Sequence, residues 1–169
     1  TILFLCTGNS CRSQMAEALL RELAKDKFIS ESAGSSPSKD KFPETQGVHP
    51  MAIETLKNNN INSDNLHSKS WDHFIKIQDE IDFVFTLCGS AKNEMTSEQC
   101  PFFPGNAIKA HWGLEDPDKA QGTEDEIKEV FQNAFDIIKK RITTFLDIDI
   151  DKMQNEELLK AVKEIGNIE

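Results

Sequence analysis

The sequence opens with TILFLCTGNSCRSQ at residues 1–14, and this stretch decides the fold. Residues 1–5 form a short apolar run, which is typical of a strand buried on both faces of a parallel sheet. Residues 6–13 are small and polar and predict a loop. Residues 14–25 predict a helix with Ser13 as its N-cap, because apolar side chains recur there at helical spacing: Met15, Ala18, Leu19 and Leu23. A strand, a polar loop and a helix in this order predict the opening of a βαβ unit.

The alternation of strands and helices continues along the chain. Further strands are predicted at residues 28–33, 81–87 and 108–112, further helices at residues 50–58, 68–77 and 123–146, and surface loops at residues 35–47 and 89–99. The last of these helices begins with Thr123 and Glu126 at the spacing of a capping box. Strands that alternate with helices indicate a three-layer α/β domain around a parallel sheet.

The length of 169 residues argues for one domain rather than two. We expect residues 1–146 to form this domain and residues 147–169 to be an acidic C-terminal extension. Apolar residues recur in this extension at helical spacing and predict one more helix, which packs on the domain through them: Leu158, Leu159, Val162 and Ile165.

Charge and composition exclude several classes of protein. The chain has 29 acidic and 19 basic residues and a net charge of -10, which argues against the basic patches of a nucleic-acid-binding protein. Its apolar runs are too short to span a membrane, and its first residues lack the basic segment of a signal peptide. The four cysteines are too few and too unevenly placed for a secreted disulfide framework. We therefore expect a cytoplasmic protein with no nucleic-acid or membrane partner, in which any anion site is built locally.

Reactive side chains follow the ends of the predicted strands. Cys6 ends the first strand as TILFLC, Cys88 ends the third as DFVFTLC, and Asp116 closely follows the fourth. Ligands of open parallel sheets bind outside the carboxyl ends of the strands. We therefore expect these three side chains to gather at the same edge of the sheet and to form an active site there.

The loop from Cys6 to Arg12 has the spacing C-x5-R. A loop that curls into a helix N-terminus turns backbone N–H groups inward and adds the positive end of the helix dipole, so it can hold a tetrahedral oxyanion. Arg12 can bind two oxygens of that anion with its planar guanidinium. The same field favours the thiolate of Cys6, which is a nucleophile at neutral pH. The predicted oxyanion-binding loop consists of Thr7, Gly8, Asn9, Ser10, Cys11, Arg12 and Ser13.

The string CTGNSCRS at residues 6–13, the order of the elements and the later Asp-Pro pair at residues 116–117 resemble the low-molecular-weight protein tyrosine phosphatase family. The resemblance implies a three-layer αβα fold with a central four-stranded parallel sheet. The site residues that it implies are the nucleophile Cys6, the anion-binding Arg12, the general acid Asp116, and Asn9 and Ser13, which orient the loop and the nucleophile. Phosphatases of this family usually carry tyrosines just after the Asp-Pro pair, whereas this chain has no tyrosine.

A second branch of that family, the thioredoxin-coupled arsenate reductases, resembles the chain more closely. The likeness is carried by Cys88, by CPFFPG at residues 100–105 and by HWGLEDP at residues 111–117. It implies a relay of two electrons through Cys6, Cys88 and Cys100. Cys6 attacks arsenate, Cys88 then attacks the Cys6 sulfur so that arsenite leaves, and Cys100 carries the resulting disulfide to the surface, where thioredoxin reduces it. The resemblance therefore predicts an arsenate reductase that binds arsenate or a phosphate-like oxyanion, uses thioredoxin and needs no cofactor.

The relay places a geometric demand on the chain. Cys88 has to approach first Cys6 and later Cys100 to a Cα separation of about 7 Å. The 11 residues between Cys88 and Cys100 form a longer spacer than we expect in most relatives. Some relatives bind a potassium ion with an acidic residue near the position of Lys69. A lysine there predicts that its ammonium replaces the cation and that no metal is bound.

Other functions remain open at this point. A phosphatase acting on phosphotyrosine or small phosphate esters would use Cys6 through a phosphocysteine intermediate and would not need Cys88 or Cys100. A sensor that binds arsenite or another oxyanion would use the same thiols without turnover. A zinc site formed by the four cysteines is disfavoured, because their spacings are C-x4-C and C-x11-C and the second pair is wider than structural zinc normally uses. Cys11 is interpreted as a residue that shapes the loop, and four histidines as surface or core side chains: His49, His67, His73 and His111.

Overall fold

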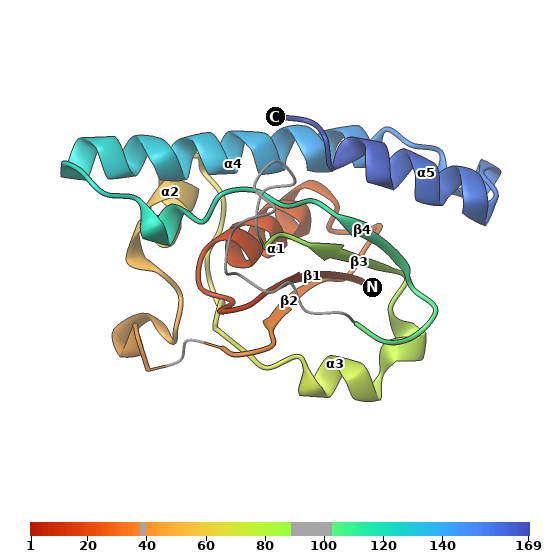
Figure 1. Ribbon diagram of the computed structural model, residues 1–169, viewed down its shortest axis with the longest axis horizontal. Helices are drawn as coiled ribbons and strands as arrows, with labels where there is room; N and C mark the ends of the chain where they lie inside the picture. Colours follow the sequence, from red (N-terminus) through yellow and green to blue (C-terminus); the bar gives the residue numbers. More distant parts are fainter. Residues whose placement is uncertain (38–39, 89–102) are drawn as a thin grey trace.

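The computed structural model describes residues 1–37, 40–88 and 103–169. Its sheet has four parallel strands in the order β2-β1-β3-β4, which Figure 1 shows at the centre of the molecule. The strands are β1 (Ile2–Cys6), β2 (Ser30–Gly34), β3 (Phe83–Thr86) and β4 (Ile108–His111). The predicted four-stranded parallel sheet is confirmed, and the strand ends lie within two residues of the prediction.

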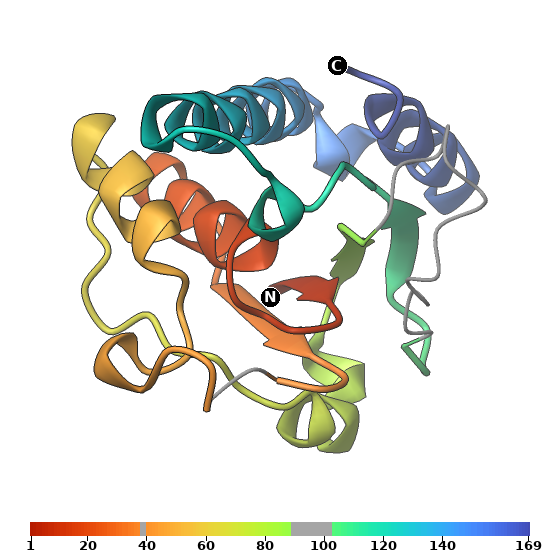
Figure 2. The same cartoon turned by 60° about the vertical axis from the view of Figure 1, so that its left-hand side comes forward.

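Helices flank both faces of this sheet in layers of very different thickness. They are α1 (Arg12–Leu23), α2 (Pro50–Asn58), α3 (Asp72–Lys76), α4 (Glu124–Leu146) and α5 (Asn155–Ile165). Figures 1 and 2 show α1, α2, α4 and α5 on one side of the sheet and the short α3 on the other. Short 3-10 helices lie at η1 (Pro43–Thr45), η2 (Gln78–Glu80), η3 (Pro117–Lys119) and η4 (Ile150–Lys152). The arrangement confirms the predicted α/β class.

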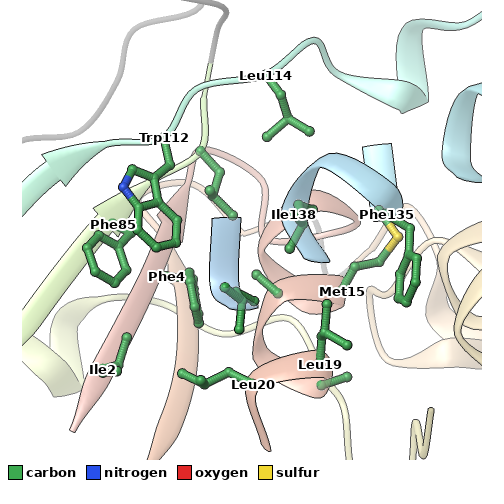
Figure 3. Close-up of a cluster of buried hydrophobic side chains, with 14 of the residues drawn as sticks. Ile2, Phe4, Met15, Leu19, Leu20, Phe85, Trp112, Leu114, Phe135 and Ile138 are labelled. Atoms are coloured by element: carbon green, nitrogen blue, oxygen red, sulfur yellow. The ribbon is translucent and has the colours of Figure 1, made fainter. Parts of the chain in front are cut away.

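The thicker layer holds the larger hydrophobic core. Phe4 of β1, Phe85 of β3 and Trp112 lie in one buried cluster with Leu19 of α1 and Ile138 of α4, as Figure 3 shows. The rings of Phe85 and Trp112 stack with their centroids 3.8 Å apart. Large aromatic side chains bury about 150–250 Å² each, so this cluster fixes the ends of β3 and β4 against the helices.

The opposite face of the sheet is covered by a smaller core. Leu3 and Leu5 of β1 pack there against Phe74 of α3 and against Phe103. Because side chains of a strand alternate between its two faces, β1 is apolar on both faces and suits the interior of the sheet. Cys6, at the carboxyl end of β1, therefore lies in the middle of the sheet edge rather than at a corner.

Two predicted elements are corrected by the structure. Ser13 is not the N-cap of α1, because the helix begins at Arg12 and Cys11 is the capping residue, without a side-chain cap hydrogen bond. The helix predicted over residues 68–77 is shortened to α3, because the chain before it follows the end of β2 instead. Gly34 N–H donates to the carbonyl oxygen of Lys69 at 2.9 Å, and Trp71 N–H donates to that of Gly34 at 3.1 Å.

Other boundaries follow the prediction. Helix α2 covers the predicted residues 50–58. Thr123 caps α4, and its hydroxyl oxygen accepts a hydrogen bond from Glu126 N–H at 3.2 Å. Among the described residues, none of the helices combines the length and the apolar composition that a membrane span requires.

The acidic C-terminal residues fold onto the sheet. Leu158, Val162 and Ile165 of α5 are buried in the larger core, whereas Leu159, which was predicted in the same stripe, is only half-buried. Trp112 Nε1 donates to the carbonyl oxygen of Val162 at 2.8 Å, which ties α5 to the segment just after β4. The division of the chain at residue 146 stays a prediction.

Candidate active site

The loop between β1 and α1 is built around the side chain of Asn9, which is fully buried on a left-handed backbone with a φ of 51°. Its Nδ2 donates to Ser13 Oγ at 2.8 Å and to Ser32 Oγ at 3.0 Å. Its Oδ1 accepts from Lys69 N–H at 2.9 Å and from Gln14 Nε2 at 3.0 Å. All the hydrogen-bonding positions of this amide are used, so the loop is held in one shape.

The loop also lies close to the end of β2. A Cβ atom at Gly34 would come within 2.5 Å of the carbonyl oxygen of Thr7, so a glycine is required where β2 passes the loop. The same oxygen accepts a hydrogen bond from Ser36 N–H at 2.9 Å. These contacts fix the beginning of the loop as firmly as Asn9 fixes its middle.

The sulfur of Cys6 lies inside the curve of this loop. Asn9 N–H points at Sγ from 3.3 Å, and Ser13 Oγ lies 3.0 Å from Sγ. Because Ser13 Oγ already accepts a hydrogen bond from Asn9 Nδ2, its own hydrogen can be donated to the sulfur. Two donors directed at Sγ stabilise a thiolate, which is the nucleophilic form of cysteine.

Arg12 begins α1, and its guanidinium is buried against the ends of two other strands. NH1 donates to the carbonyl oxygens of Leu87 at 3.1 Å and Leu114 at 3.0 Å. NH2 lies 3.6 Å from Asp116 Oδ2. These contacts hold a permanent positive charge at the carboxyl edge of the sheet, beside the loop, where it can act on an anion.

Asp116 approaches the loop from the end of β4. It caps η3, with Oδ1 accepting a hydrogen bond from Asp118 N–H at 3.0 Å. The same oxygen lies 3.5 Å from Cys11 Sγ, and its side chain is 17% exposed. A carboxyl group in this position can exchange protons with water while it faces the loop.

The two free thiols of the loop differ in character. Cys6 and Cys11 are both buried, but only the sulfur of Cys6 is met by Asn9 N–H and Ser13 Oγ. Burial raises the pKa of the Cys11 thiol, and the nearby Asp116 carboxylate raises it further. Cys11 therefore stays protonated and donates toward Asp116, in agreement with its interpretation as a residue that shapes the loop.

Cys88 lies directly after β3 and is 2% exposed. Leu87 N–H donates to the carbonyl oxygen of Leu5 at 2.8 Å, so the segment that carries Cys88 runs beside the end of β1, which carries Cys6. Cys88 is disulfide-bonded, whereas Cys6 is a free thiol. Cys100 lies outside the described residues, so the structure does not describe the transfer of the disulfide from Cys88 to Cys100.

A buried polar network connects α1, β2 and the segment before α3 to Asn9 of the loop. Glu17 of α1 is 1% exposed, and its Oε1 accepts from Ser32 Oγ and from Lys69 Nζ, each at 2.9 Å. Lys69 Nζ also donates to the carbonyl oxygen of His67 at 3.3 Å. The ammonium of Lys69 thus lies among oxygen atoms of Glu17 and His67, and its replacement of a bound cation stays a prediction. In the described part of the chain, no group of three or more His, Cys, Asp or Glu side chains is arranged to hold a metal.

No role was predicted for Gln14, Glu17 or Ser32, although all three are buried in this network. Gln14 and Glu17 lie with Arg21 on the polar side of α1, away from the apolar stripe, and this pattern is typical of a solvent-exposed face. His49 and Asp118, which pair beside the site, come with no sequence signal either. They come from distant segments of the chain, so only the fold brings them together.

The comparisons with known proteins agree with this geometry. Residues 1–162 match the family described as low molecular weight phosphotyrosine protein phosphatase. The chain is 42% identical over 144 residues to the arsenate reductase of Oceanobacillus iheyensis, a match that covers 85% of this chain and 93% of that protein.

Solved structures extend the likeness. The fold matches that of an arsenate reductase in the phosphate binding state, with a TM-score of 0.60 and 29% identity, over 84% of this chain and 92% of that one. It also matches the thioredoxin-dependent arsenate reductase of Corynebacterium glutamicum, with a TM-score of 0.52 and 26% identity, over 84% of this chain and 61% of that one.

Proposed function

The chain belongs to the low molecular weight phosphotyrosine protein phosphatase family, and we propose that within it the protein is an arsenate reductase that passes two electrons through Cys6, Cys88 and Cys100. The proposal is supported by about 40% identity to proteins named arsenate reductase along most of their length. The observation that carries the chemistry is the position of Cys6 Sγ, which receives hydrogen bonds from Asn9 N–H and Ser13 Oγ at the N-terminus of α1.

In the first step, the Cys6 thiolate attacks the arsenic of an arsenate bound by the backbone N–H groups of the loop and by Arg12. A sulfur–arsenic bond forms and one arsenic–oxygen bond breaks. Asp116 gives its proton to the departing oxygen, which leaves as water or hydroxide. The arsenic is still pentavalent in the adduct, so no electrons have moved yet.

In the second step, the thiolate of Cys88 attacks the sulfur of Cys6. A sulfur–sulfur bond forms, the sulfur–arsenic bond breaks, and its electron pair stays on arsenic, which leaves as trivalent arsenite. The two sulfurs have together lost the two electrons that arsenic gained. Cys100 then attacks Cys88 and releases the Cys6 thiolate, and a dithiol reductant such as thioredoxin reduces the Cys88–Cys100 disulfide.

The test separates these steps with two serine variants. In steady-state assays with thioredoxin, thioredoxin reductase and NADPH, Cys88→Ser and Cys100→Ser should each lower arsenate turnover by about 1,000-fold or more. In a single turnover without reductant, Cys100→Ser should still release one arsenite per protein, because Cys6 and Cys88 suffice for reduction, whereas Cys88→Ser should release none. Multiple turnover that survives both substitutions would contradict the relay.

The same experiment judges the alternative of a phosphatase, which the description of the family favours. Hydrolysis of a phosphate ester needs Cys6, Arg12 and Asp116 but neither Cys88 nor Cys100. A wild-type protein that hydrolyses phenyl phosphate, does not reduce arsenate and is unaffected by both serine substitutions would be a phosphatase. Weak ester hydrolysis beside strong arsenate reduction is expected, because one oxyanion loop serves both reactions.

A further inference from the structure

His49 is connected to three parts of the candidate site at once. Its backbone N–H donates to the carbonyl oxygen of Ser10 in the oxyanion-binding loop at 2.8 Å. Its ring nitrogen Nδ1 accepts from Met51 N–H at 3.0 Å and so caps α2. Its other ring nitrogen, Nε2, lies 3.1 Å from Asp118 Oδ1 in the turn that follows Asp116.

These contacts fix the hydrogen on the His49 ring. Nδ1 accepts a hydrogen bond from a backbone N–H, so it carries no hydrogen of its own, and the hydrogen of the neutral ring is on Nε2. Nε2–H therefore donates to Asp118 without any need for a charged imidazole. The ring is held in this orientation between Phe42 and Phe131, with centroid distances of 4.7 Å and 4.8 Å.

Asp118, which His49 holds in place, in turn fixes the position of the Asp116 carboxyl group. Its side chain is bound by His49 on one oxygen and by Lys41 on the other. Its backbone N–H donates to Asp116 Oδ1 at 3.0 Å. A shift of Asp118 would therefore turn the carboxyl group of Asp116 relative to Arg12 and the loop, and proton transfer is sensitive to such shifts.

We propose that His49 and Asp118 are positioning residues of the reaction, which hold the carboxyl group of Asp116 in the direction from which it protonates the leaving oxygen. The inference rests on the proposed function, because it assigns Asp116 the part of general acid. His49 adds a specific coupling, since the same residue binds the loop that holds the oxyanion and the turn that carries the acid.

A double-mutant cycle tests this coupling. Asp118→Ala should lower kcat for arsenate reduction by about 3- to 10-fold, the effect of one lost hydrogen bond, with KM changed by less than about 2-fold. In a protein that already carries Asp116→Ala, the same substitution should have no further effect. If Asp118→Ala lowers kcat by the same factor in both backgrounds, the two residues act independently and the inference is wrong.

Conservative variants distinguish positioning from folding. Asp118→Asn keeps an acceptor oxygen for His49 Nε2–H and should retain kcat within about 2-fold of wild type. His49→Asn keeps a cap for α2 but is too short to reach Asp118, so it should lower kcat as Asp118→Ala does, while its circular dichroism spectrum shows that it is still folded at the assay temperature. Asp149→Ala and His73→Asn, at exposed positions away from the site, are the matched controls and should leave kcat unchanged.

The cycle is run on phenyl phosphate hydrolysis as well, because a poor leaving group also requires a proton from Asp116. A protein that hydrolyses the ester with the predicted non-additivity, but does not reduce arsenate, would overturn the proposed function and keep the inference. A protein that reduces arsenate, but in which the effects of Asp116→Ala and Asp118→Ala are additive, would keep the proposed function and overturn the inference. A wild-type protein that turns over neither substrate would overturn both.

Discussion

The loop after β1 and the turn after β4 meet at the same edge of the sheet but are held in different ways. In the loop, Asn9 and Ser13 are fully buried and hydrogen-bonded to one another. In the turn, Asp118 is held by side chains that water reaches: the exposed fractions are 15% for His49, 20% for Asp118 and 54% for Lys41. The loop therefore holds the nucleophile Cys6 rigidly, whereas the turn leaves the acid Asp116 more freedom to adjust its position.

The largest effect is expected from Asn9→Ala, which removes the buried amide at the centre of the loop. The substitution leaves buried partners of the amide unsatisfied and puts an alanine on a left-handed backbone, so the free energy of unfolding should fall by about 2–4 kcal/mol. Urea unfolding measures this loss. The matched control is Asn60→Ala, at an exposed asparagine with a similar φ of 61°, which should cost only about 1 kcal/mol. Equal losses at the two positions would show that the buried network adds nothing.

A smaller effect is expected from Ser13→Ala, which removes one donor from Cys6 Sγ. A hydrogen bond to a charged group contributes about 1.5–3 kcal/mol, so alkylation of Cys6 by iodoacetamide at neutral pH should slow by about 10-fold or more. Ser68→Ala is the control, because Ser68 Oγ donates to the carbonyl oxygen of Gly8 in the same loop and not to the sulfur. Equal alkylation rates for wild type and Ser13→Ala would contradict the assigned hydrogen bond.

The turn is expected to respond to pH through His49. Burial lowers the pKa of its ring, Lys41 lowers it further, and Asp118 and Asp116 oppose the shift, while Glu124 of α4 borders the same hollow. The unfolded chain, in which a histidine has a pKa of about 6.5, then binds the proton first as the pH falls. The free energy of unfolding should therefore decrease below about pH 6.5 until the lower folded pKa is reached.

Urea unfolding between about pH 7.5 and about pH 5 measures this dependence. His49→Asn has no titrating ring and should show a smaller decrease than wild type. A protonated ring would also direct a hydrogen on Nδ1 at Met51 N–H and lose the cap of α2. The same pH dependence in both proteins would mean that His49 does not contribute to it.

The smallest effect is expected from Lys41→Ala. Lys41 pairs with Asp118 at the surface, and exposed ion pairs contribute less than about 1 kcal/mol. The free energy of unfolding should therefore fall by less than about 1 kcal/mol, and kcat should change by less than about 2-fold. A loss of kcat as large as that of Asp118→Ala would mean that Lys41, rather than His49, is the main contact that holds Asp118.

The difference between the two regions also explains what the sequence could predict. Cys6, Arg12 and their loop are contiguous, so their spacing and their place between a strand and a helix indicated an oxyanion site. The alternation of apolar segments indicated the sheet for the same reason. The prediction of Ser13 as an N-cap was wrong, because a hydroxyl at the start of a helix can either cap the helix or bind a neighbouring side chain. Here Ser13 Oγ lies 3.0 Å from Cys6 Sγ and takes the second role.

The sequence could not predict the roles of residues whose partners lie in distant segments of the chain. His49 caps α2 in place of the usual Ser, Thr, Asp or Asn, and nothing in its neighbourhood points to Asp118. Asn9, Glu17 and Lys69 form one network only because β1, α1 and the segment before α3 converge in three dimensions. Such contacts depend on the topology of the sheet, which local patterns do not specify.

In the proposed relay, Cys6 and Cys88 together supply the two electrons of arsenate reduction. Mass spectrometry of the fully reduced protein, after treatment with arsenate and without any added reductant, detects the disulfide that this oxidation must leave. We predict one intramolecular disulfide per released arsenite, Cys6–Cys88 or, after transfer, Cys88–Cys100. A protein in which all four cysteines remain thiols after this treatment would contradict the account.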